Sequence, residues 1–154
     1  MYRILVQRAT RKTFAPAAPL LKKWATSALR QLISSAELTI RIVNEKEMLA
    51  LNSNYRHKHY ATNVLSFPFE IPSDVQMDIP LLGDIVICAA VVNAEADTQH
   101  KTVEAHWAHM IVHGVLHLLG YDHENETDAV KMETEEIRIL QTLNFSNPYE
   151  IIKE

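Results

Sequence analysis

The 154 residues, 47% hydrophobic and 22% charged, are ordinary for one soluble globular domain with its own core. A single cysteine, Cys88, excludes an internal disulfide, and the lack of a secretory signal pattern or of a long apolar stretch makes the cytoplasm the expected compartment. The net charge of -4 is unevenly divided: residues 1–58 carry eleven Lys or Arg and three Glu, whereas residues 59–154 carry four basic and sixteen acidic residues. This asymmetry fits either a basic face for a polyanion or solvated helix faces that differ in sign.

The first part of the chain predicts two strands and two helices. Residues 2–7 are a short apolar segment and are expected to form a strand. Two prolines mark the entry to a helix that runs to about Ile33 and has apolar side chains along one side. Alternating apolar and polar residues over 38–42 predict a second strand. Asn44 can then cap a helix that runs to about Asn54.

The middle of the chain predicts two more strands with a loop between them. Residues 63–69 are predicted to form a strand, in which Pro68 favours a position at the edge of the sheet. Residues 71–80 contain two prolines and are expected to be a loop. Residues 83–88 are nearly all apolar, which indicates a strand buried on both faces, and residues 89–97 are expected to form a short helix.

Two longer helices are predicted toward the C-terminus. Thr102 can cap a helix over residues 103–119, which Gly120 would end in a left-handed turn. Thr127 can cap a final helix that runs to about Leu143. The residues of the final helix expected to face the core are Val130, Ile137 and Leu140. Helices and strands are therefore mixed, which predicts a single α+β or α/β domain over residues 1–154, with about four strands and four or five helices.

Five of the eight histidines lie between His106 and His123, and three of them have the spacing of metal ligands. His113 and His117 are separated by four positions, so on a helix their Cβ atoms lie roughly 6 Å apart on one face. Both rings could then bind one ion at about 2.0–2.1 Å. Gly120 allows a positive φ, and the turn it makes can bring His123 back toward them. The spacing predicts one transition metal ion, most simply zinc, with a fourth position open to water.

The segment from His113 to His123 also has the spacing of the long zinc motif of metzincin proteases. In that motif a Glu follows the first His and acts as the general base. Gly114 occupies this position here. The ligands for a metal are retained, but the proton acceptor of the protease mechanism is missing.

Neighbouring polar residues leave more than one interpretation open. His106 and His109 are interpreted as packing residues or as supports for the ligands. Asp122 either forms the turn or accepts a hydrogen bond from a ligand imidazole. A purely structural zinc with Asp122 as the fourth ligand is the competing use of the site, although structural sites usually contain several cysteines.

A cationic loop precedes the strand at residues 63–69. It comprises Arg56, His57, Lys58 and His59. Such a loop is usually just solvated, but arginine can hold a phosphate through paired N–H donors, and a metal can polarise an oxygen or activate water. Together with the histidines, the loop predicts hydrolysis of a phosphodiester, with Arg56 as the catalytic residue that neutralises charge on the phosphate.

These residues resemble the YbeY family, bacterial endoribonucleases of ribosomal RNA maturation. The likeness extends from about Asn52 to the C-terminus. The segments that carry it are Tyr55–Arg56, Thr62–Pro68, Gly83–Ile85 and His109–His123. The chain departs from the family pattern at His57, His59 and Ala61, where the family commonly has Gly, Asp and Pro.

The resemblance implies an α+β fold with a small, mostly parallel sheet and a metal site on the long helix and the turn after it. It implies zinc-dependent cleavage of single-stranded RNA in small-subunit rRNA 3′-end maturation and in ribosome quality control. His113, His117 and His123 match the family's ligands for zinc, one ion per chain, and Arg56 matches its functionally important arginine. The implied partners are ribosomal RNA, the small ribosomal subunit and its assembly factors, with no membrane.

Three alternatives remain open on the sequence. Nickel or another transition metal could occupy a three-imidazole site in vitro. The metzincin-like spacing allows a metalloprotease or another zinc hydrolase. A ribosome-assembly factor with a chiefly structural zinc is a third possibility, and it predicts that metal removal unfolds the domain.

Overall fold

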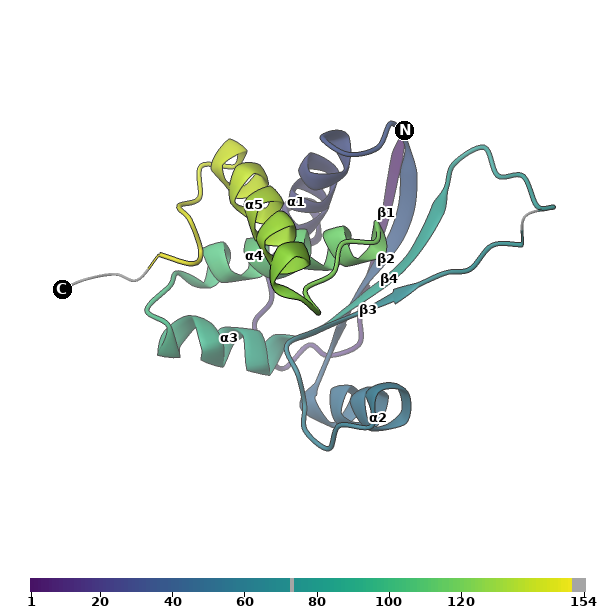
Figure 1. The fold of residues 1–154 in the computed structure, drawn as a ribbon. Helices are drawn as coiled ribbons and strands as arrows, with labels where there is room; N and C mark the ends of the chain where they lie inside the picture. Colours follow the sequence, from purple (N-terminus) through teal and green to yellow (C-terminus); the bar gives the residue numbers. More distant parts are fainter. Residues whose placement is uncertain (73, 151–154) are drawn as a thin grey trace.

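The computed structural model describes residues 1–72 and 74–150. The sheet contains β1 (Tyr2–Arg8), β2 (Ala36–Val43), β3 (Val64–Pro68) and β4 (Leu81–Cys88) in the order β1-β2-β4-β3. Strands β1, β2 and β4 run parallel to one another, and β3 runs antiparallel to β4 at the edge of the sheet (Figure 1). The predicted edge position of Pro68 is therefore confirmed.

Five helices accompany the sheet in the described part of the chain. They are α1 (Ala18–Arg30), α2 (Glu45–Arg56), α3 (Ala89–Thr98), α4 (Val103–Leu118) and α5 (Glu126–Thr142). Figure 1 shows α2 apart from the other four helices. The mixture of four strands and five helices is as the residue pattern predicted, and the α+β fold with a mostly parallel sheet is as the family resemblance implied. None of these helices combines the length and apolar character needed to cross a membrane.

Side-chain alternation along the strands separates two cores. In β2 the side chains of Leu38, Ile40 and Ile42 are fully buried and pack with residues of α1, α4 and α5. Val43 and Met48 belong to a smaller cluster on the opposite face, under α2. The larger core holds α4 against the sheet, and α4 is the helix that carries the histidines.

Two details of α5 correct the prediction from sequence. The helix begins at Glu126, and the side chain of Asn125, not Thr127, caps it by accepting a hydrogen bond from the Asp128 N–H at 2.8 Å. Thr127 already lies inside the first turn. Val130 was expected to face the core but is 57% exposed, because it lies on the opposite side of the helix from the buried stripe. That stripe comprises Met132, Glu136, Ile139 and Leu140.

Candidate metal centre and cleft

The three predicted ligand histidines meet at the C-terminal end of α4. The Nε2 atoms of His113 and His117 are 3.0 Å apart, and the ring of His123 has its centre 5.6 Å from that of His113 and 5.0 Å from that of His117. One nitrogen from each ring lies within 4.8 Å of the others. Two tetrahedral ligands at 2.0–2.1 Å from zinc would be about 3.3 Å apart. The donor set therefore fits a metal ion with little movement.

The turn after α4 positions His123. Gly120 has a φ of +96°, and the Tyr121 N–H donates to the Leu116 carbonyl at 3.0 Å, which closes the helix end as a left-handed turn. Asp122 accepts a hydrogen bond from the Glu124 N–H at 2.7 Å. Of its two proposed roles, the structure shows the one in the turn.

Burial favours the neutral, ligand form of the central histidine. Burial, together with the positive charges that His113 and His123 can carry, lowers the pKa of His117 to about 4. A neutral imidazole has a free lone pair for a metal. At neutral pH protons therefore compete only weakly for this ring.

Close packing explains why Gly114 stands where metzincins have Glu. A Cβ atom at this position would lie 2.8 Å from Cγ2 of Ile85 on β4, and the Gly114 carbonyl accepts a hydrogen bond from Ser66 Oγ at 3.2 Å. Helix α4 thus approaches the sheet too closely for a side chain here. A carboxylate cannot take the protease position unless the Ile85 side chain or the helix moves.

The histidines open into a cleft of about 430 Å³ between α4, β3 and the end of α2. Arg56 and Lys58 line the same cleft, as do the polar side chains of Tyr60 and Asn63. None of its described lining residues is acidic. The cleft therefore combines a possible metal site with two cations and suits a phosphate group.

Local hydrogen bonds shape the loop that carries Arg56. His57 has a φ of +56°, in the left-handed region that favours glycine. The Lys58 N–H donates to the Asn52 carbonyl at 3.2 Å, and the Asn52 side chain donates to the Tyr60 carbonyl at 2.8 Å. These contacts hold the chain reversal that places Arg56 and Lys58 at the cleft.

A buried carboxylate, Glu136 of α5, lies behind the histidines and was not predicted. It is 1% exposed and accepts hydrogen bonds from His113 Nδ1 at 3.1 Å, from the Tyr149 hydroxyl at 2.8 Å and from His109 Nε2. Burial raises its pKa, but the bonds from His109 and His113 outweigh burial and lower it to about 2. The carboxylate is therefore ionised at neutral pH. No signal in the sequence pointed to it, because a glutamate on a helix is usually exposed.

A second carboxylate, Glu95 of α3, supports the other wall of the cleft and was also missed. It accepts hydrogen bonds from His106 Nε2 at 3.0 Å and from Asn63 Nδ2 at 3.1 Å. Burial alone would raise the pKa of Glu95, but these bonds lower it overall. His109 thus supports His113 through the buried Glu136, as considered for it. His106 instead bonds the half-buried Glu95, which holds Asn63 and none of the three predicted ligands.

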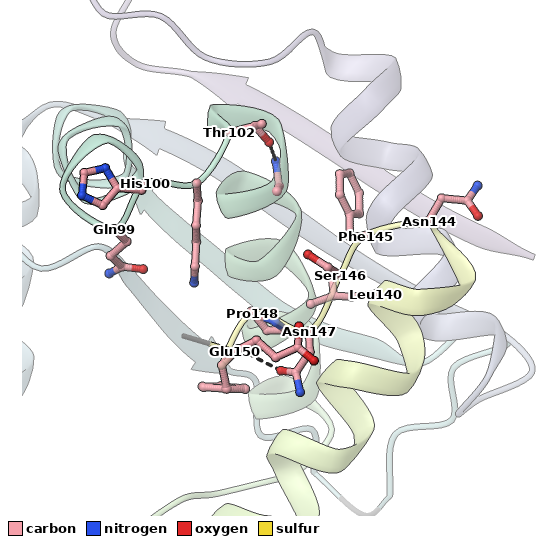
Figure 2. Close-up of a pocket in the computed structure, with 13 residues that line it drawn as sticks. Gln99, His100, Thr102, Leu140, Asn144, Phe145, Ser146, Asn147, Pro148 and Glu150 are labelled. Carbon is pink, nitrogen blue, oxygen red and sulfur yellow. Dashed lines mark hydrogen bonds between the residues drawn. The ribbon is translucent and has the colours of Figure 1, made fainter. Parts of the chain in front are cut away.

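A larger cavity of about 670 Å³ lies between the α3–α4 connection and the segment that follows α5 (Figure 2). Lys101 and Tyr149 are among its lining residues, and none of the three ligand histidines is. It is therefore separate from the cleft. Tyr149 of this cavity donates a hydrogen bond to Glu136, which in turn bonds His113 of the cleft.

The chain is similar to known proteins in both sequence and fold. A family model described as "Endoribonuclease YbeY" matches residues 7–144. Proteins described as endoribonuclease YbeY are 50% identical over 147 residues in Nitrosococcus oceani (96% of each chain) and 52% identical over 149 residues in Pseudomonas putida (97% of this chain, 94% of that one). A solution structure from Thermotoga maritima shares the fold, with a TM-score of 0.59 at 24% identity over 97% of this chain and 99% of that one.

Proposed function

The chain belongs to the YbeY endoribonuclease family, and we propose that it is a zinc-dependent endoribonuclease specific for single-stranded RNA. We further propose that it acts in the cytoplasm, in small-subunit rRNA 3′-end maturation and ribosome quality control. The observation that carries the proposal is one cationic cleft that contains His113, His117, His123 and Arg56.

Each of these side chains has a defined task in the proposal. The three imidazoles hold the ion, and a bound zinc would supply Lewis-acid chemistry by polarising an oxygen or lowering the pKa of water. The Arg56 guanidinium binds the phosphate and offsets the negative charge that grows on it during cleavage. Lys58 adds a second positive charge to the same cleft. Because no described lining residue is acidic, the mechanism does not rely on a carboxylate base in the cleft.

Two features support RNA as the substrate, and the first of them favours unpaired RNA. Tyr60 lines the cleft and is 56% exposed, so its ring is available to stack on an unpaired base. The basic composition of residues 1–58 suits a phosphate backbone. Ribosomal RNA as the substrate, and the small subunit with its assembly factors as partners, follow from the family resemblance.

The metalloprotease alternative is disfavoured by the packing at Gly114. The site lacks the carboxylate that would act as general base, and Ile85 leaves no room for one. A chiefly structural zinc is disfavoured by the exposed position of His123 at the mouth of a cleft, because structural sites are normally closed by four protein ligands. Thermal melts with and without a chelator test this: a catalytic zinc leaves most of the fold intact when it is removed, whereas a structural one does not.

The proposed function is tested by comparing wild type, His117→Ala and Arg56→Ala. Metal content is measured by elemental analysis, and cleavage is measured on single-stranded and fully paired RNA of the same sequence. We expect zinc in the wild type, loss of zinc and cleavage in His117→Ala, and a fall in kcat/KM of roughly 10²–10³ in Arg56→Ala. Arg30→Ala, a change of the same type on the exposed side of α1, serves as the control. Undiminished cleavage by His117→Ala would reject the proposal.

A further inference from the structure

The environment of Glu136 is unusual for a charged side chain. It lies on the buried face of α5 among Met132, Ile139 and Leu140, and burying an ionised carboxylate is costly unless hydrogen bonds satisfy it. Its two oxygens receive bonds from three different groups. A buried apolar residue would pack there at a lower cost in free energy. The presence of a carboxylate at this position therefore suggests a function beyond packing.

The hydrogen bond between Glu136 and His113 indicates what that function is. The Nδ1 atom of His113 is 3.1 Å from Glu136 Oε1, while its Nε2 atom lies 3.0 Å from His117 Nε2. A carboxylate only accepts hydrogen bonds, so Nδ1 must carry the hydrogen. In the neutral ring Nε2 is then left with a free lone pair, and this is the atom that faces the other histidines.

We propose that Glu136 is the positioning residue of the metal site: by accepting the His113 Nδ1 hydrogen it fixes the tautomer and orientation of that ring for metal binding. The inference rests on the proposed function because it takes the three histidines as the ligands. A hydrogen-bonded carboxylate also makes an imidazole a more basic, stronger ligand. Glu136 itself does not reach the cleft and is not a catalytic residue.

Two further contacts hold the carboxylate in place. His109, one turn before His113 on α4, donates to Oε2, and the Tyr149 hydroxyl donates to the same oxygen at 2.8 Å. His109 and Tyr149 rings also contact each other edge to face, with centres 5.4 Å apart. The segment after α5 is thereby tied to the back of the metal site, opposite the cleft. Tyr149→Phe removes one of the three donors and should weaken metal binding less than a change at Glu136.

The first test measures zinc affinity by competition with a chromophoric chelator. Glu136→Gln keeps the size of the side chain but removes its charge, and we expect zinc affinity to fall 10–100-fold. Glu133→Gln makes the same chemical change at an exposed position of α5 and should bind zinc like the wild type. Melting curves of the metal-free proteins report whether the variants remain folded. Wild-type zinc affinity in a folded Glu136→Gln protein would overturn the inference.

The second test needs neither a variant nor a metal. Nitrogen chemical shifts of the histidine rings, measured by NMR on metal-free wild type at alkaline pH, report which nitrogen carries the hydrogen. We expect the Nδ1–H form for His113, and a predominant Nε2–H form would overturn the inference even if RNA is cleaved. Conversely, the Nδ1–H form in a protein that cleaves no RNA would reject the proposed function and leave the placement of Glu136 supported.

Discussion

At the scale of single residues, the proposed metal site is surrounded by side chains that face away from it and shape it from behind. Gly114 has no side chain because α4 lies against Ile85. Glu136 is a buried carboxylate and Glu95 a half-buried one, and each accepts hydrogen bonds from residues of one wall of the cleft. None of these three residues lines the cleft. Substitutions of them should therefore change the stability of the fold and its dependence on pH.

Filling the space at Gly114 should destabilise the fold. Alanine favours a helix by about 1 kcal/mol over glycine, but its Cβ would meet the buried Ile85 side chain at 2.8 Å. We expect Gly114→Ala to lower the free energy of unfolding by about 1–3 kcal/mol, measured by urea denaturation. Ile85→Val combined with Gly114→Ala should recover only a small part of this loss, because it removes Cδ1 at 3.1 Å but keeps Cγ2. A more stable Gly114→Ala protein would show that the close approach is not a constraint.

The Glu95 interactions should give stability that disappears in acid. Hydrogen bonds from His106 and Asn63 lower the pKa of Glu95 below its ordinary value of 4.5, so the folded protein binds this proton less tightly than the unfolded chain. The contribution is therefore present above pH 4.5 and is lost as the pH falls through the lowered pKa. We expect Glu95→Gln to lower the free energy of unfolding by about 1–2 kcal/mol near neutral pH. This difference from the wild type should disappear in acid.

Denaturation curves of the metal-free proteins across this pH range measure the difference in the free energy of unfolding between wild type and Glu95→Gln. Glu133→Gln, at an exposed position, is the matched control and should follow the wild type at every pH. A gap between wild type and Glu95→Gln that persists below the lowered pKa would contradict the assignment.

At the scale of elements, helix ends decide where the ligands lie. The Thr102 side chain caps α4 by accepting from the Ala105 N–H at 3.1 Å, and the Gly120 turn ends it. Asn125 then starts α5 two positions after His123. The third ligand is therefore held in a short turn between two helices whose ends are both fixed.

The identity of the α5 cap can be tested directly. Asn125→Ala removes the hydrogen bond to the Asp128 N–H and should cost about 1 kcal/mol. Thr127→Ala, inside the first turn, should cost less, because its side chain makes no hydrogen bond in the described structure. Thermal melts of both variants show which one loses more stability. A larger loss in Thr127→Ala would support Thr127 as the cap, as expected from the sequence.

At the scale of the whole molecule, the charge asymmetry should govern how RNA is bound. Arg56 and Lys58, from the basic part of the sequence, lie at the cleft, while the remaining cations of residues 1–58 do not line it. Removing a single cleft cation should therefore change the salt dependence of binding by about one phosphate contact.

We expect Arg56→Ala to reduce the slope of log affinity against log salt concentration by about 0.7, the value for one contact to single-stranded nucleic acid. Fluorescence anisotropy of labelled single-stranded RNA measures the affinity at each salt concentration. All the proteins compared carry His117→Ala to prevent cleavage. Lys22→Ala, on α1 and away from the cleft, should leave the slope close to that of the parent protein. An unchanged slope for Arg56→Ala would place the RNA elsewhere.

The sequence by itself determined the features that depend on local order along the chain. Periodicity identified the helices and strands, the four-residue spacing put His113 and His117 on one face, and Gly120 marked the chain reversal before His123. Helix geometry and left-handed turns are local properties, so neighbouring residues suffice to predict them. The predicted cap at Thr127 was wrong, because Asn125 caps α5 in the structure.

Only the tertiary structure decided which distant residues meet. Arg56 reaches the histidine cleft because β3 lies at the sheet edge beside α4, and Glu136 reaches His113 because α5 packs back over α4. A buried Glu on an otherwise apolar stripe cannot be distinguished in sequence from an exposed one until the packing of the two helices is known. Contacts between elements depend on that packing, and no spacing along one chain segment encodes it.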